Sequence, residues 1–96
     1  MLSADRPITP FRATYEVTES SVVVRVAGEL DLATAPELAE LFAHAEWDRP
    51  VVLDLTAVSF IDSSGIRALC RAADEAARRG VAFQAVEASG PVARTL

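Results

Sequence analysis

Hydrophobic and polar positions alternate near the start of the chain and then give way to helical spacing. The stretch Phe11 to Val17 alternates, which places its apolar side chains on one face of a strand. A turn at Glu19–Ser21 follows, and Val22 to Ala27 indicates a second strand that ends at Gly28. Because the connection is so short, the two strands are predicted to form an antiparallel hairpin.

A loop and a helix are predicted next. Residues Glu29 to Ala33 form the loop, and Thr34 and Glu37 have the spacing of a capping box, with Thr34 as the cap and Glu37 reaching back. Apolar residues then recur at i, i+3, i+4 and i+7, the spacing of one buried helical face. These residues are Leu38, Leu41, Phe42 and Ala45.

The second half of the chain predicts a strand, a helix and another strand. Val51 to Leu55 is almost continuously apolar, as expected for a strand covered on both faces. A helix follows up to Arg79, and Gly80 is its expected left-handed terminator. Its predicted buried face consists of Ile66, Leu69, Cys70, Ala73 and Ala77, and its predicted ion pairs are Arg71–Glu75 and Asp74–Arg78.

A parallel strand should complete the sheet. Val81 to Val86 is predicted to run parallel to the preceding strand, because a helical crossover joins the two. Gly90 and Pro91 open a last helix. The order β-β-α-β-α-β-α therefore predicts an α/β fold, a single domain over residues 11–96 with helices packed on a mixed sheet. Residues 1–10 are expected to form a flexible leader.

Composition narrows the classes of function. A chain of 96 residues with 51% hydrophobic residues suits one small core, and no apolar run reaches the roughly 20 residues of a membrane span. The net charge of -5 and the lack of a basic stripe argue against a nucleic-acid partner. A single cysteine and an N-terminus without the apolar region of a signal peptide favour a cytoplasmic protein.

The candidate chemistry lies in the segment Asp62-Ser63-Ser64-Gly65, where the strand pattern changes to the helical one. Two adjacent hydroxyls at the start of a helix suit either a plain N-cap or a position to which a phosphate is added. Asp62 is best explained as a structural acid near the helix start, with an orienting role second.

Enzymatic motifs are missing from the sequence. It contains no Gly-x-Ser-x-Gly elbow for a serine hydrolase, and no Gly-x-Gly-x-x-Gly or Walker lysine for a nucleotide-binding enzyme. The one histidine, His44, falls on the polar side of its helix, away from the serine pair. We therefore expect a protein that is not an enzyme and that needs no cofactor or metal.

Four segments follow one another along the chain: Gly28–Asp31, Val51–Leu55, Phe60–Gly65 and Ser89–Arg94. Together they closely resemble the STAS domains of bacterial anti-sigma factor antagonists, in which the same motifs occur in this order. The resemblance runs from about Phe11 to Leu96, and Asp-Ser-Ser-Gly is its specific element. Family members usually continue into another strand and helix, so we expect either that the sequence given is incomplete or that this is a minimal, C-terminally shortened version.

The resemblance implies a phosphorylation site at Ser63. In that family, the serine directly after the aspartate is phosphorylated by an anti-sigma factor that is itself a serine kinase. The unphosphorylated antagonist binds the anti-sigma factor and frees the sigma factor, the phosphorylated form does not bind, and a phosphatase resets the switch. The residues implied to bind the partner are Glu29, Asp31, Asp62, Ser64, Gly65 and Arg67.

Alternatives remain at several of these positions. Asp31 equally suits a brace for the loop before the helix, and Ser64 suits a cap or first-turn residue. Gly65 would either let a kinase approach Ser63 closely or serve packing between helix and strand. The alternative function is a non-switching STAS scaffold subunit of an ATPase, a transporter or a sensory complex, which would not need a phosphorylatable serine.

Three further side chains are expected to have structural roles. Cys70 is predicted to be a buried core thiol, and Phe60 a core anchor beneath the candidate site. Asp54 lies inside an apolar strand, so its carboxylate should point to an edge or accept a hydrogen bond from an N–H group.

Overall fold

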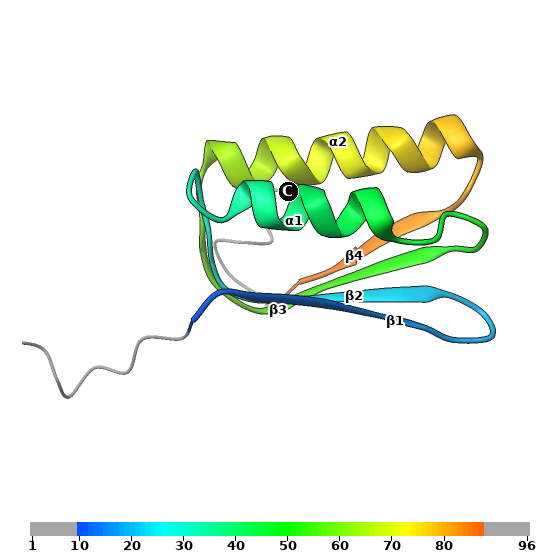
Figure 1. The fold of residues 1–96 in the computed structure, drawn as a ribbon, viewed down its shortest axis with the longest axis horizontal. Helices are drawn as coiled ribbons and strands as arrows, with labels where there is room; N and C mark the ends of the chain where they lie inside the picture. The colour runs from blue at the N-terminus through cyan, green and yellow to red at the C-terminus, as the bar shows by residue number, and fades with distance from the viewer. Residues whose placement is uncertain (1–9, 88–96) are drawn as a thin grey trace, which may run out of the picture.

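The computed structural model describes residues 10–87, which form one sheet with two helices packed on it (Figure 1). The sheet has four strands in the order β1-β2-β3-β4, with β1 antiparallel to β2 and the other neighbours parallel. The elements along the chain are β1 (Arg12–Val17), β2 (Val22–Leu30), α1 (Ala35–His44), β3 (Val51–Ile61), α2 (Ser63–Arg79) and β4 (Phe83–Val86).

This order confirms the predicted α/β fold over the described residues, including the hairpin and the parallel last strand. The predicted leader up to residue 9 and the last predicted helix lie outside those residues. Both helices cover the same face of the sheet and run side by side (Figure 1). Each parallel step moves one strand further in the same direction, so two right-handed crossovers necessarily place both helices on one side.

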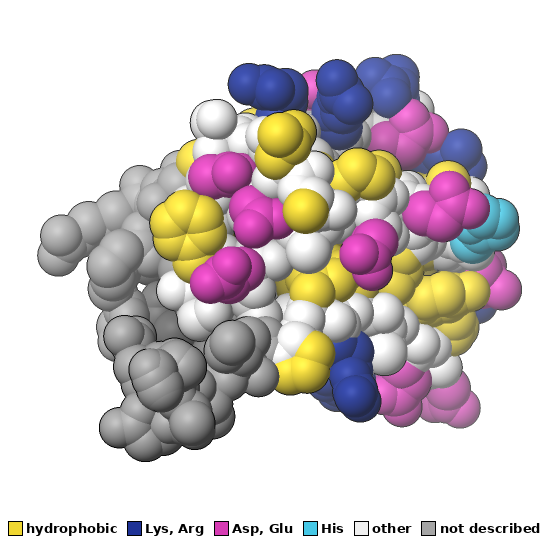
Figure 2. All heavy atoms as spheres, turned by 60° about the vertical axis from the view of Figure 1, so that its left-hand side comes forward, with side chains coloured by type: hydrophobic (Ala, Val, Ile, Leu, Met, Phe, Trp, Pro, Cys, Tyr) yellow, Lys and Arg dark blue, Asp and Glu magenta, His cyan; other side chains and the backbone are white. Residues whose placement is uncertain are grey.

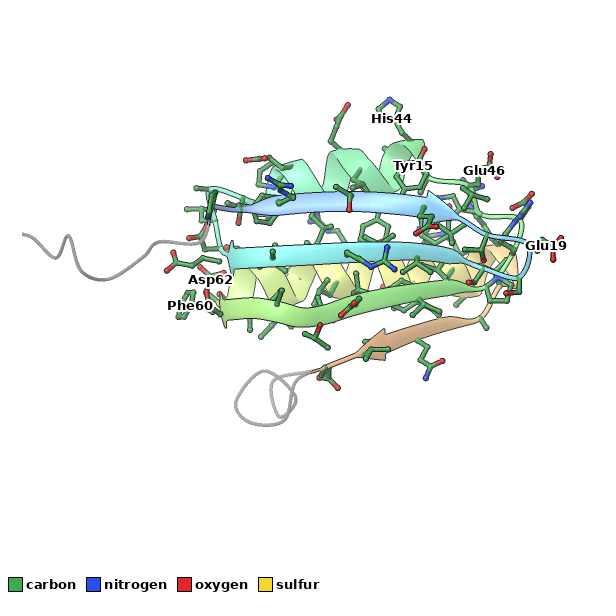
Figure 3. The ribbon with its side chains drawn as sticks, turned by 90° about the horizontal axis from the view of Figure 1, so that it is seen from below. Tyr15, Glu19, His44, Glu46, Phe60 and Asp62 are labelled. Atoms are coloured by element: carbon green, nitrogen blue, oxygen red, sulfur yellow. The ribbon has the colours of Figure 1, made fainter. Side chains whose placement is uncertain are left out.

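The core lies between this helical layer and the sheet. Alternate side chains of β2 and β3 point into it, and they meet Leu38 and Phe42 of α1. The opposite face of the sheet carries no helix among the described residues, as Figure 3 shows. The expectation that β3 is covered on both faces is therefore wrong, because the strand alternates between buried and partly exposed positions over Val51–Leu55. Its buried residues are Val51, Leu53, Leu55 and Val58.

Strands β2 and β3 are longer than predicted because they pair through two irregularities. The register shifts once between Arg25 and Ala27 and again between Gly28 and Glu29. Gly28 lies inside β2 and does not end it, and its φ of 89° is a value that favours glycine. A Cβ at this position would lie 2.9 Å from the Pro10 carbonyl oxygen. The bulged pairing thus extends both strands toward the end of the sheet.

The buried face of α2 differs from the predicted one by about one residue. Its buried residues are Gly65, Leu69, Ala72 and Ala76, whereas the prediction shares only Leu69 with this set. Cys70 is exposed, so the predicted core thiol is wrong. Alanines occupy both candidate faces of this helix, and the face with the smaller side chains is the one that is buried.

The end of α2 is stabilised as predicted, but its ion pairs differ. Gly80 terminates the helix in the left-handed conformation with a φ of 71°. Glu75 pairs with Arg78 and Arg79, in place of the predicted Arg71–Glu75 and Asp74–Arg78 pairs. The hydrogen bonds from Arg79 and from Arg78 lower the pKa of the Glu75 carboxyl below its ordinary value.

Asp54 behaves as predicted for a carboxylate in an apolar strand. Its Oδ1 accepts hydrogen bonds from the Thr56 hydroxyl at 2.6 Å and from the Thr56 N–H at 2.9 Å. These bonds lower the pKa of Asp54, with the hydroxyl as the larger cause. These local hydrogen bonds explain why a carboxylate is tolerated in this strand, and we assign Asp54 no functional chemistry.

Candidate functional site

Two connections meet at the end of the sheet where the parallel strands β2 and β3 finish. One leads from β2 into α1, and the other leads from β3 into α2 (Figure 1). The Asp62 N–H donates to the Leu30 carbonyl oxygen at 3.1 Å, which ties the two connections together. The structure therefore brings the predicted residues Glu29 and Asp31 to the same end of the molecule as the Asp62–Gly65 segment.

Asp62 is the N-cap of α2. It has extended backbone, and its Oδ1 accepts a hydrogen bond from the Gly65 N–H at 3.0 Å. This bond satisfies one of the N–H groups that lack a partner in the first turn of a helix. The expected structural role of Asp62 is confirmed, and the capping position is not occupied by either serine.

Ser63 is the first residue of α2 and its side chain is exposed. Its hydroxyl lies at the end of the helix where the dipole favours negative charge. Ser64, the next residue, is half-buried and lines a groove between the two helices. The two hydroxyls therefore differ in access, and Ser63 is the more accessible of the two.

Gly65 is buried against the end of β2. A Cβ at this position would lie 2.6 Å from the Leu30 carbonyl oxygen and 2.8 Å from Cγ1 of Ile61. Real Cβ atoms do not approach a backbone oxygen this closely, so no larger residue fits without moving α2 away from β2. Of the two roles weighed for this glycine, packing between helix and strand is the one its position favours.

Asp31 braces the loop between β2 and α1. Its Oδ1 accepts hydrogen bonds from the Ala33 N–H at 3.0 Å and the Thr34 N–H at 3.1 Å. The Thr34 hydroxyl donates to the Glu29 carbonyl oxygen at 2.8 Å and makes no cap bond to α1. Thr34 occupies the N-cap position of α1 as predicted, but the side-chain bonds of the predicted capping box are wrong, because the loop uses the threonine hydroxyl itself.

Two exposed hydrophobic side chains lie at this end and were not predicted to be exposed there. Leu32 follows Asp31 in the loop and is 76% exposed, and Phe60 near the end of β3 is 50% exposed. The predicted core role of Phe60 is wrong. The second register shift pairs Phe60 with the exposed Glu29 and places Ile61 opposite the buried Leu30.

Acidic and hydrophobic side chains therefore share this end of the molecule, as Figure 2 shows. We call this surface the acidic end, and it comprises Glu29, Asp31, Leu32, Phe60, Asp62 and Ser63. The N-termini of α1 and α2 both point to it, and their positive dipole ends offset part of the negative charge. Arg67, one turn further along α2, is exposed at its edge.

In residues 10–87, no group of three histidine, cysteine or acidic side chains is close enough together to hold a metal ion. Neither α1 nor α2 combines the length and the apolar character needed to cross a membrane.

A comparison with protein-family models places residues 12–96 in the STAS domain model. The chain belongs to the STAS domain family. This match covers nearly the whole chain and both connections of the acidic end. The fold, the order of the motifs and the family model therefore agree.

Three solved structures extend this comparison. An anti-sigma factor antagonist from Mycobacterium paratuberculosis is 31% identical, with a TM-score of 0.76 over 90% of this chain and 74% of that chain. The Bacillus cell fate determinant SpoIIAA in its phosphorylated form is 22% identical, with a TM-score of 0.67 over 90% of this chain and 78% of that chain. The murine anion transporter Slc26a9 is 20% identical, with a TM-score of 0.70 over 83% of this chain and 14% of that chain.

The second and third structures share the fold at low identity, so they carry no functional assignment by themselves. A search of curated protein sequences found no match.

Proposed function

We propose that this STAS domain is an anti-sigma factor antagonist that is switched by phosphorylation of Ser63. The unphosphorylated form binds an anti-sigma factor that is a serine kinase, and so releases a sigma factor. A phosphatase that removes the phosphate from Ser63 restores binding. The similarity to the mycobacterial antagonist supports the class of function.

The observation that carries the proposal is that Asp62, not Ser63, caps α2. A plain N-cap was the structural explanation for a serine at this position, and the neighbouring aspartate already fills that role. Ser63 is exposed on the first turn, where its hydroxyl can accept the γ-phosphoryl group of ATP, lose its proton and leave ADP as the other product.

A phosphate at Ser63 would abolish binding without unfolding the domain. It adds a charge of about −1.5 to −2 beside Asp62 and Asp31, at a helix start that tolerates negative charge. A partner that faces this surface would then meet a doubly charged group that has to be desolvated. A penalty of about 4 kcal/mol lowers affinity roughly a thousandfold, which is enough for a switch.

The test is to incubate the chain with ATP and with each anti-sigma kinase of the same genome, and to measure intact mass and binding. One added phosphate that maps to Ser63, together with loss of binding, is the expected result. Ser63→Ala should bind but accept no phosphate, Ser63→Glu should bind poorly, and Ser64→Ala should still accept one phosphate at Ser63. Normal phosphorylation of Ser63→Ala would overturn the site assignment.

The alternative is a STAS scaffold that binds its partner without a switch. Binding of a kinase or another partner with no phosphate transferred, and with Ser63→Glu binding as tightly as wild type, would favour it over the proposal.

A further inference from the structure

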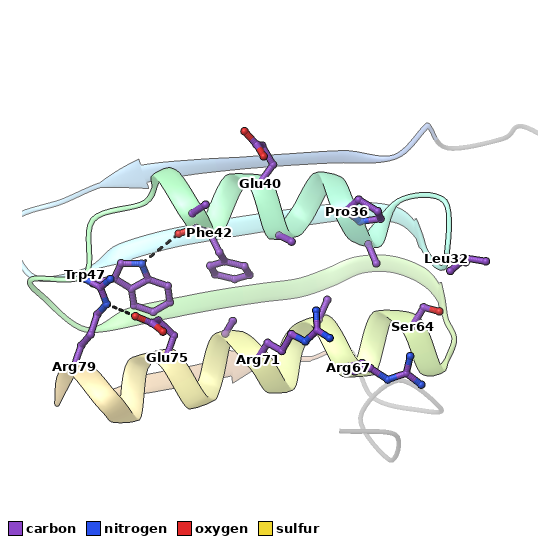
Figure 4. A pocket seen from close by; sticks show the side chains of 15 residues that line it. Leu32, Pro36, Glu40, Phe42, Trp47, Ser64, Arg67, Arg71, Glu75 and Arg79 are labelled. Carbon is purple, nitrogen blue, oxygen red and sulfur yellow. Dashed lines mark hydrogen bonds and ion pairs between the residues drawn. The ribbon is translucent and has the colours of Figure 1, made fainter.

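A groove of about 640 Å³ runs between α1 and α2 on the side of the helical layer away from the sheet (Figure 4). Small side chains make its floor: Ala39 and Ala43 from α1, and Ala68 and Ala72 from α2. The groove begins at Leu32 and Ser64, beside the acidic end, and reaches Trp47 and Arg79 near the other end of α2. It is therefore continuous with the surface that carries Ser63.

At the end of the groove away from Ser64, contacts within the chain hold the Trp47 side chain in place. The Trp47 indole N–H donates to the Phe42 carbonyl oxygen at 3.2 Å, and the two rings lie 6.0 Å apart. The Arg79 guanidinium lies 5.7 Å from the centre of the Trp47 ring and also pairs with Glu75. This end is thus already ordered before anything binds.

Two arginines of α2 along the groove form no ion pair with any residue in the range 10–87. The arginines that form ion pairs among the described residues are Arg25, Arg49, Arg78 and Arg79, and neither Arg67 nor Arg71 takes part in one. Both are exposed, and Figure 4 shows Arg71 extending over the space between the helices. Glu40 of α1 also lines the groove, and Glu75 of α2 is already paired with Arg78 and Arg79. The arginine pair therefore makes the α2 side of the groove a local site for acidic groups on a chain with a net charge of -5.

The geometry matches a helix of a protein partner. Arg67 and Arg71 are one turn apart, so they can meet two acidic side chains spaced by one turn on a bound helix. From Ser64 to Arg79 the groove follows about 22 Å of α2, enough for roughly four helical turns. An amphipathic helix can place its apolar side chains on the alanine floor and its acidic side chains toward the arginines.

We propose that this groove binds an acidic amphipathic helix of the anti-sigma partner, so that the partner contacts both Ser63 and the groove. The proposal rests on the proposed function. The acidic end and the arginine side of the groove then attract opposite charges on one partner, which fixes its orientation along the molecule.

The test compares the affinity of the anti-sigma kinase for variants of the unphosphorylated chain. Arg71→Glu should weaken binding at least tenfold, and Ala39→Trp, which fills the groove without a charge change, should also weaken it. Arg12→Glu makes the same charge change on exposed β1 and should leave affinity within about twofold of wild type. Melting temperatures of all three variants show whether each one is folded.

A photo-crosslinking residue at position 39 identifies the occupant directly. It should attach to an acidic helical segment of the partner, and reversing an acidic residue of that segment to arginine should restore binding to Arg71→Glu. Attachment to residues 88–96 of the same chain, to a second copy of this chain, or to a co-purified fatty acid would overturn the proposal.

The two proposals can fail separately. If the kinase binds wild type but binds Arg71→Glu and Ala39→Trp equally well, the groove proposal is wrong and the proposed function stands. If no anti-sigma factor binds the wild-type chain, the proposed function itself fails and the groove assignment fails with it.

Discussion

At the scale of single residues, Gly65 shows how the candidate site is held in place. The Leu30 carbonyl oxygen occupies the space that a Cβ on Gly65 would need, and the same oxygen accepts the hydrogen bond from the Asp62 N–H. One backbone atom thus fixes both the closeness of α2 to β2 and the position of the cap. Ser63 lies between these two anchored residues.

We expect Gly65→Ala to destabilise the domain. Overpacking a tight contact costs about 1–3 kcal/mol, and the gain of about 1 kcal/mol in helix propensity offsets only part of this because the clashing atom belongs to the backbone. The measurement is the free energy of unfolding from denaturant titration. Ser64→Ala in the same turn is the control and should change little. A Gly65→Ala variant as stable as wild type would contradict the packing role.

Asp31 has two separable roles, and two substitutions distinguish them. Asp31→Asn keeps an oxygen that can accept the loop hydrogen bonds but removes the charge, so it should preserve the melting temperature and weaken partner binding. Asp31→Ala removes the acceptor as well and should also cost roughly 1–2 kcal/mol of stability. Melting temperature and dissociation constant are measured for both. Unchanged binding of Asp31→Asn would leave the residue with the brace alone.

At the scale of elements, the sequence predicts the order and type of every described helix and strand, but it misplaces the faces of some. The alternation of apolar and polar residues identifies β1 and the start of β2. The second half of β3 is not predicted, because two register shifts interrupt its pairing with β2. In α2, alanines on both candidate faces leave the buried stripe ambiguous, and Gly65 decides it by allowing close approach to Leu30. Such contacts join residues far apart in sequence, so local patterns do not contain them.

The same limit applies to the candidate site. The segment Asp62–Gly65 is visible from its place between a strand and a helix, and so is the structural role of Asp62. The exposure of Leu32 and Phe60 cannot be predicted from the sequence, because it depends on the pairing of β2 with β3. The groove also escapes sequence analysis, since it requires α1 and α2 to lie side by side.

The last turn of α2 should give a measurable pH dependence. Arg79 and Arg78 lower the pKa of Glu75 from its ordinary value of 4.5, so the folded state binds fewer protons than the unfolded state in that range. The stabilisation is fully present above pH 4.5 and is lost as pH falls through the lowered pKa. Glu75→Gln should therefore melt below wild type at pH 7, and the difference should shrink steadily as pH falls below 4.5.

The control for this pH series is Glu37→Gln, an exposed residue in the first turn of α1 with no ion pair among the described residues. Its melting temperature should follow that of wild type more closely at every pH. A Glu75→Gln difference that stays constant from pH 7 to acid would mean that Glu75 stabilises α2 by packing instead of by charge.

At the scale of the whole molecule, negative and positive side chains gather on different parts of the surface. Acidic side chains gather where α1 and α2 begin, while arginines follow the outer surface of α2. The layer of two parallel helices therefore presents negative charge beside Ser63 and positive charge along the groove. A phosphate on Ser63 increases the first without touching the core, which lies below the helices.

The fold should consequently survive a negative charge at Ser63. Ser63→Glu adds a charge at the first residue of α2, where the helix dipole contributes about 0.3–1 kcal/mol in its favour and the nearby acids oppose it. These effects nearly cancel, so its melting temperature should lie within a few degrees of that of Ser63→Ala, because 1 kcal/mol shifts a domain of this size by about 4–8 °C. A drop of 10 °C or more, with loss of helical circular dichroism, would mean that phosphorylation acts by unfolding α2, and not by repelling a partner from an intact surface.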